Sequence, residues 1–203
     1  MSVIHDTTMV PTKRELMAEW LPKQEWFEGD AAPALSVAGG FRLDDPSGEV
    51  GLEMILLLDS AREEPVLYHV PLSYRGAALA GAEDYLLGTS EHGVLGTRWI
   101  YDAAGDPVWQ EQMRALFAGK VQAQHQNDSN VLDGSVTVEP ALAAPAAEPS
   151  EAGAKAAEAH AGLAVIRRPA AGGAGSGEAR AWVRVPWTDA KGASGAGAVV
   201  ELA

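Results

Sequence analysis

A stretch of alternating aromatic and charged residues between Tyr68 and Asp106 is the part of the sequence best suited to bind a small molecule. Aromatic rings can stack on a sugar or a base, and Arg, Glu and His side chains supply directional hydrogen bonds. The candidate binding residues in this stretch are Tyr74, Arg75, Glu91, His92, Arg98, Trp99 and Tyr101. The same residues could instead pack together under a polar rim, and their spacing alone favours packing.

The sequence lacks the patterns of the common catalytic and metal sites. Its five histidines form no H-E-x-x-H motif, and the glycines at 88, 93 and 96 are not followed by the Lys and Ser or Thr of a phosphate-binding loop. Ser90 and His92 are close in sequence, but no G-x-S-x-G turn supports a serine nucleophile. A protein-kinase catalytic loop is also missing. The patterns therefore predict no catalytic residue, no metal ligand and no cofactor.

Composition and charge limit the partners of the chain. It has 203 residues, of which 28 are acidic and 15 basic, and a formal net charge of −13. Nucleic acids and anionic membranes attract clustered Lys and Arg, so we expect neither as a partner. There is no cysteine for a disulfide, and the longest strongly apolar run, Met54–Leu58, is too short to span a bilayer. With no secretory pattern at the N-terminus, we expect a soluble, cytoplasmic protein.

The first 120 residues contain clear signals for two helices and several strands. Thr12 and Glu15 have the spacing of a capping box, which predicts a short helix that ends or bends at Pro22. Asp106 and Gly119 are suited to begin and end a second helix. The stretch that carries the candidate residues is expected to be rich in loops. Three runs are predicted to be strands: Ala34–Leu43, Glu49–Asp59 and Pro65–Ser73.

Composition changes near residues 120–130, because aromatic residues become rare and alanine becomes common. We therefore predict an α+β domain at 1–125, an Ala/Pro-rich linker or helix at 126–162, and a small antiparallel β region at 163–203 that packs on the first domain. Its predicted strands are Leu163–Arg167, Ala179–Val185 and Ala198–Leu202. The expected fold class is α+β, with an antiparallel sheet and segregated helices, followed by a smaller β-rich region.

Three segments give the first part of the chain a family resemblance. They read LPKQEWFEGD, YHVPLSYRG and LLGTSEHGVLGTRWIYDAAGDPVW, at Leu21–Asp30, Tyr68–Gly76 and Leu86–Trp109. In this combination they resemble the N-terminal cap of actinobacterial maltokinases and of related cap-bearing sugar kinases, including glucosamine kinases. In that family the cap precedes a two-lobed kinase module that binds ATP, magnesium and maltose. No motif of that module is found here, so no catalytic position carries over.

The resemblance implies a cap-like protein without kinase lobes. We expect a non-catalytic regulatory or binding module that acts in trans, on a kinase or another enzyme of α-glucan, maltose or trehalose metabolism. The alternative is a small-molecule binder, for a sugar or a nucleotide, and homodimerisation stays open. A kinase or glucan-branching enzyme is the least favoured reading, since branching normally needs a much larger barrel.

Overall fold

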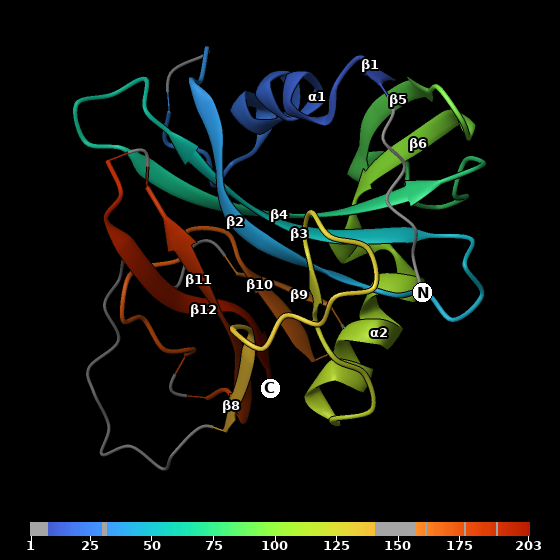
Figure 1. The fold of residues 1–203 in the computed structure, drawn as a ribbon. Helices are drawn as coiled ribbons and strands as arrows, with labels where there is room; N and C mark the ends of the chain where they lie inside the picture. The colour runs from blue at the N-terminus through green and yellow to red at the C-terminus, as the bar shows by residue number, and fades with distance from the viewer. Residues whose placement is uncertain (1–7, 30–31, 141–156, 161, 177, 190) are drawn as a thin grey trace.

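Two antiparallel β-sheets packed against each other form most of the protein (Figure 1). The computed structural model describes residues 8–29, 32–140, 157–160, 162–176, 178–189 and 191–203. Helix α1 covers one face of the larger sheet, and helix α2 lies on the opposite face, beside the smaller sheet. The predicted α+β class with segregated helices is therefore wrong, because the described residues are mostly β.

The larger sheet has seven strands in the order β1-β5-β6-β4-β3-β2-β7. Each pair of neighbours is antiparallel. The strands are β1 (Met9–Val10), β2 (Leu35–Leu43), β3 (Gly51–Asp59), β4 (Val66–Arg75), β5 (Leu86–His92), β6 (Gly96–Asp102) and β7 (Gln124–His125). Strands β2, β3 and β4 confirm the three predicted runs. Short 3-10 turns connect parts of this region: η1 (Leu21–Lys23), η2 (Glu83–Tyr85) and η3 (Ala103–Gly105).

Strands β5 and β6 replace the loop-rich stretch that the sequence predicts. They pair along their length around the turn at residues 93–95, with a bulge between Leu86 and Gly88. Glycine and threonine occupy many of their positions, and most of their side chains are partly or fully exposed. The apolar/polar alternation that identifies a half-buried strand is therefore weak, which is why the hairpin escapes detection in the sequence.

Strand β3 is buried on both faces, as its composition predicts, because alternate side chains enter two different clusters. The inner cluster lies between the two sheets and contains Phe41, Leu43, Val50, Leu52, Met54, Leu56, Ala103, Ala104, Trp109, Met113, Leu116, Ala123, Leu163, Val165, Val183, Val185, Val199 and Val200. The outer cluster lies under α1 and contains Leu16, Met17, Trp20, Leu21, Trp26, Leu35, Ile55, Leu57, Tyr68, Val70, Leu72 and Ile100. The larger sheet thus has a core on each side.

Helix α1 (Lys13–Trp20) begins at the predicted capping box. The Thr12 hydroxyl accepts a hydrogen bond from the Glu15 backbone N–H at 3.2 Å, and the Glu15 carboxylate accepts one from the Thr12 N–H at 2.7 Å. The regular helix ends just before Pro22, where the 3-10 turn η1 takes over. Its buried side chains attach this helix to the outer cluster.

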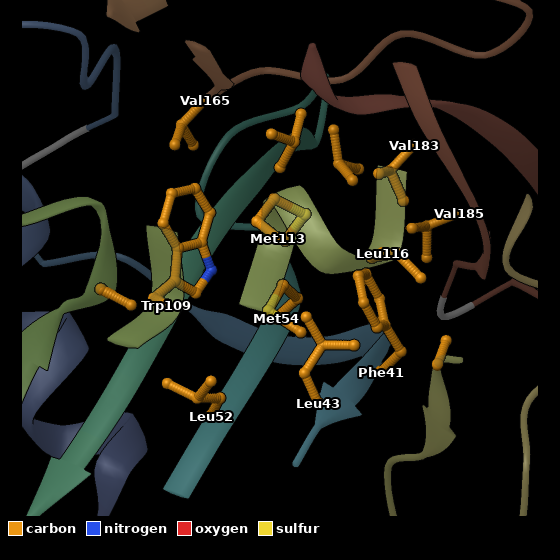
Figure 2. Packing of buried hydrophobic residues seen from close by; sticks show 14 of the residues in the cluster. Phe41, Leu43, Leu52, Met54, Trp109, Met113, Leu116, Val165, Val183 and Val185 are labelled. Atoms are coloured by element: carbon orange, nitrogen blue, oxygen red, sulfur yellow. The ribbon is translucent and has the colours of Figure 1, made fainter. Parts of the chain in front are cut away.

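Helix α2 (Pro107–Phe117) confirms the second predicted helix. The Asp106 carboxylate caps it by accepting from the Val108 N–H at 2.9 Å, and Gly119 follows its end with a φ of +67°. Figure 2 shows Trp109, Met113 and Leu116 directed into the inner cluster. This helix therefore packs its buried side chains into the inner cluster from beside the smaller sheet.

The smaller sheet has five strands in the order β8-β11-β12-β10-β9. They are β8 (Thr137–Pro140), β9 (Ala157–His160), β10 (Leu163–Ile166), β11 (Ala181–Thr188) and β12 (Ser194–Leu202). Val165, Val183 and Val185 project from this sheet into the inner cluster (Figure 2). The last three strands confirm the three runs predicted near the C-terminus.

Two strands of the smaller sheet, β8 and β9, come from the segment predicted to be a linker or helix. Residues 141–156 and 161 of that segment lie outside the described residues, and Ala157–His160 forms β9. The division into domains at 1–125, 126–162 and 163–203 stays a prediction.

Candidate functional site

The seven candidate binding residues lie on three neighbouring strands but on both faces of the larger sheet. Arg75 is opposite Trp99, whereas Tyr74 is opposite Ile100 of the outer cluster. Because side chains alternate along a strand, the register separates the residues into two groups. Arg75, Glu91, Trp99 and Tyr101 share the face of α2. Tyr74, His92 and Arg98 share the face of α1. One ligand on one face would thus meet only part of the set.

Arg75 is bound to the start of α2. Its Nε and Nη2 atoms donate to the two carboxylate oxygens of Asp106, each at 2.7 Å. Burial alone would raise the pKa of the Asp106 carboxyl, but hydrogen bonds from Arg75, Ser73 and the Val108 N–H hold that pKa below its usual value. The hydrogen bonds that Arg75 donates to the Asp106 carboxylate also raise the pKa of Arg75. The guanidinium therefore has a defined structural partner.

Tyr74 belongs to a polar cluster around Glu53, a buried carboxylate in β3. Glu53 accepts from Lys13 Nζ at 2.7 Å, from the Tyr74 hydroxyl at 2.7 Å and from Gln126 Nε2 at 2.9 Å. Burial acts to raise the pKa of Glu53, but the positive charge of Lys13 and these hydrogen bonds lower it overall. Burial and the adjacent carboxylate raise the pKa of Tyr74 well above its usual value. The cluster joins α1, β3, β4 and the segment after β7.

The turn between β5 and β6 is held in place by contacts of three of the candidates. His92 Nδ1 accepts from the backbone N–H groups of Val94 and Leu95, at 3.2 and 3.1 Å. Arg98 Nη2 donates to the Leu95 carbonyl at 2.8 Å. Glu91 accepts from the Thr97 hydroxyl at 2.7 Å. These contacts give the turn a defined conformation and leave Val94 and Leu95 exposed, at 62% and 45%.

The two aromatic candidates on the α2 face differ in exposure. Tyr101 is 2% exposed, and its hydroxyl accepts from the Leu79 N–H at 2.8 Å. Trp99 is partly exposed and lies between Arg75 on β4 and Thr89 on β5. Of the pair, Trp99 is therefore the ring that a ligand from solvent could reach.

The structure also reveals a buried polar group that sequence reasoning misses. Arg167, directly after β10, forms a bidentate ion pair with Asp102 at the end of β6. Its guanidinium carbon lies 5.0 Å from the centroid of the Trp26 ring. His69 of β4 is next to it, with its ring fully buried. These residues are far apart in sequence, so no local pattern could have brought them together.

The described residues offer neither a cluster of metal ligands nor a membrane-spanning helix. They contain no group of three or more His, Asp or Glu side chains arranged to hold a metal ion. None of their helices has the length and apolar character needed to cross a membrane.

Comparison with known proteins gives a family match over the part of the chain that carries the candidate residues. No curated protein matches the chain. The family model of the maltokinase N-terminal cap domain matches residues 20–106. The matched span runs from the end of α1 through β2–β6 to Asp106, the residue that Arg75 holds at the start of α2, and it includes all seven candidates. The resemblance seen in the sequence is confirmed over this span, since residues 20–106 match the model of the maltokinase N-terminal cap domain.

Proposed function

We propose that this protein is a non-catalytic module that binds a kinase-type enzyme of maltose, trehalose or other α-glucan metabolism and acts on it in trans. The observation that carries the proposal is the match of residues 20–106 to the maltokinase cap, a domain that belongs to such kinases. From this match we expect the chain to offer a surface suited to recognise a kinase module of the same family.

The chemistry of the cap supports a binding role over a catalytic one. Within the matched span, Glu53, Tyr74, Asp106 and Arg75 all have pKa values shifted by their surroundings, and each is held by neighbours within the fold. Strongly perturbed groups of this kind occur at active sites, but also in structural ion-pair networks. Here each bond connects one element of the fold to another, as expected of a network that maintains the shape of a docking module.

The direct test mixes the purified chain with a maltokinase from which its own cap has been removed. We expect a complex on size-exclusion chromatography with light scattering, and a change in the kcat or KM of maltose phosphorylation when the chain is added. Heat-unfolded chain is the matched control, because it keeps the net charge of −13 without the fold. No complex and unchanged kinetics with several such kinases would refute the proposal.

A second arm of the same experiment tests the enzyme alternative. The chain alone is incubated with ATP and either maltose or glucosamine at high protein concentration. We expect no ATP consumption above the buffer control. Phosphorylated sugar formed by the chain alone would replace the binding proposal with a catalytic one.

A further inference from the structure

The smaller sheet is joined to the larger one at an open edge of β4. Strand β6 pairs with β4 only from Leu72 to Arg75, so the first half of β4 has no strand neighbour on that side among the described residues. The segment after β10 takes this place, because the His69 N–H donates to the Arg167 carbonyl at 2.8 Å. The backbone of the smaller sheet thus continues the hydrogen bonding of the larger sheet.

Side chains strengthen the same junction. Arg167 is fully buried, pairs with Asp102 and lies against the Trp26 ring. The next residue, Arg168, forms an ion pair with Glu28 near the surface. We call the group of Trp26, His69, Asp102 and Arg167 the seam. Burial in the seam removes the Arg167–Asp102 pair from water, so its two members depend on each other.

His69 is the titratable member of the seam. Its ring is fully buried, and neither ring nitrogen has a hydrogen-bond partner of normal geometry in the described part of the chain. Leu56 of the neighbouring strand β3 is paired with His69. The backbone groups of Ile166 in β10 and Val199 in β12 lie close to the His69 ring. The charged side chains around it are Arg167 and, paired with that residue, Asp102. A second positive charge at this point would oppose Arg167.

We propose that the seam is an acid-sensitive latch: protonation of His69 releases the smaller sheet, while the larger sheet keeps its fold. The larger sheet can survive the separation because the outer cluster and α1 cover its other face. The smaller sheet has no comparable second cluster among the described residues. It therefore depends on the inner cluster and on the seam.

The direction of the pH effect follows from proton linkage. Burial, and next the charge of Arg167, lower the pKa of His69 from 6.5 to about 3, while the backbone groups of Ile166 and Val199 act slightly in the opposite direction. A released, hydrated His69 binds protons below its usual pKa, whereas the latched one does not. Acid therefore favours release, and the effect is complete once pH falls below the latched pKa. Between pH 7.5 and 4.5 this favours the released state roughly a hundredfold.

Hydrogen exchange followed by mass spectrometry tests the latch on the full chain. After correction for the intrinsic rate, peptides from β10–β12 should lose protection by about two orders of magnitude between pH 7.5 and 4.5, relative to peptides from β3 and β4. His69→Leu, which removes the proton site and the unpartnered nitrogens, should abolish this difference, and His69→Gln provides a polar replacement. His125→Gln, at a partly exposed histidine of β7, is the matched control and should behave like wild type.

Two results would overturn the latch. One is loss of protection in both sheets together, which would mean a single cooperative unfolding step. The other is the same pH dependence in wild type and in the His69 variants. Exchange of the C2 hydrogen of histidine rings gives a reading without any substitution. A His69 midpoint at the ordinary histidine pKa of 6.5 would mean that the fold does not hold the ring neutral, and the histidine would then not be the trigger. These outcomes do not depend on whether a kinase binds.

Discussion

Arg75 and Asp106, 31 positions apart, are joined by two parallel hydrogen bonds of 2.7 Å each. Asp106 also caps α2, so the pair connects the end of β4 to the first turn of the helix that fills the inner cluster. These two ionisable residues therefore fix the position of a helix. Burial differs across the pair, since the Asp106 side chain is fully buried and that of Arg75 is 19% exposed.

Removal of Arg75 should therefore be costly. Arg75→Met leaves the buried Asp106 carboxylate with only its weaker partners, and we expect a loss of about 3 kcal/mol in the free energy of unfolding. Urea denaturation at pH 7 measures it. Arg168→Met is the matched control, because its pair with Glu28 is partly exposed and should contribute less than about 1 kcal/mol. Equal losses in the two variants would mean that the buried pair has no special role.

The sequence predicted the elements whose signals are local. The capping box at Thr12, the Asp106 cap of α2 and the two-sided apolar run of β3 depend on neighbouring residues only, and all three are confirmed. The family resemblance is confirmed over residues 20–106. The predicted fold class was wrong because the two short helices have clear local signals, whereas the hairpin of β5 and β6 has none. That hairpin contains glycine and threonine and lacks clear apolar/polar alternation.

The candidate site was only partly predictable. The seven candidates, chosen for their density of aromatic and charged groups, lie on neighbouring strands that the sequence did not predict in full, and the face of each side chain depends on register, which short-range spacing does not give. The seam could not be predicted at all. Arg167 and Asp102 are 65 positions apart, and only the packing of the two sheets brings them together.

Lys13→Met should make stability less dependent on pH. In the fold the pKa of Glu53 is lowered, so its carboxylate stabilises the native state above its unfolded pKa, and this contribution is lost as pH falls through the folded value. Without Lys13, which is 37% exposed, we expect a loss of roughly 1 to 2 kcal/mol at pH 7. The loss should shrink near pH 4, as Glu53 accepts a proton.

Urea denaturation at pH 7 and pH 4 gives the comparison for this variant. Lys23→Met, at an exposed lysine of η1, is the control and should change stability little at either pH. A deficit of Lys13→Met that stays constant or grows on acidification would contradict the assigned role of the ion pair.

Gly40 should be intolerant of any side chain. Its φ is +143°, and a Cβ atom there would lie 2.2 Å from the Met54 carbonyl oxygen and 3.1 Å from Gln126 Nε2. Gly40→Ala must therefore shift β2 away from β3, and we expect a loss of more than about 2 kcal/mol. Gly134→Ala, where a Cβ meets nothing within 4 Å, should change stability by less than about 0.5 kcal/mol. Similar melting temperatures for the two variants would argue against close contact at Gly40.

The small-molecule alternative makes a prediction that depends on the face of the sheet. Arg98 and Trp99 are adjacent in β6, so their side chains point to opposite faces. If a maltose-type sugar stacks on the exposed part of Trp99, Trp99→Ala should weaken its binding by at least tenfold in calorimetric titration, equivalent to about 1.4 kcal/mol. Arg98→Ala should leave that affinity unchanged, which makes it the control for fold integrity. Equal loss of affinity in both variants would exclude a binding site on one face of the sheet. No binding heat with the wild-type protein would exclude binding of the sugar at the concentrations tested.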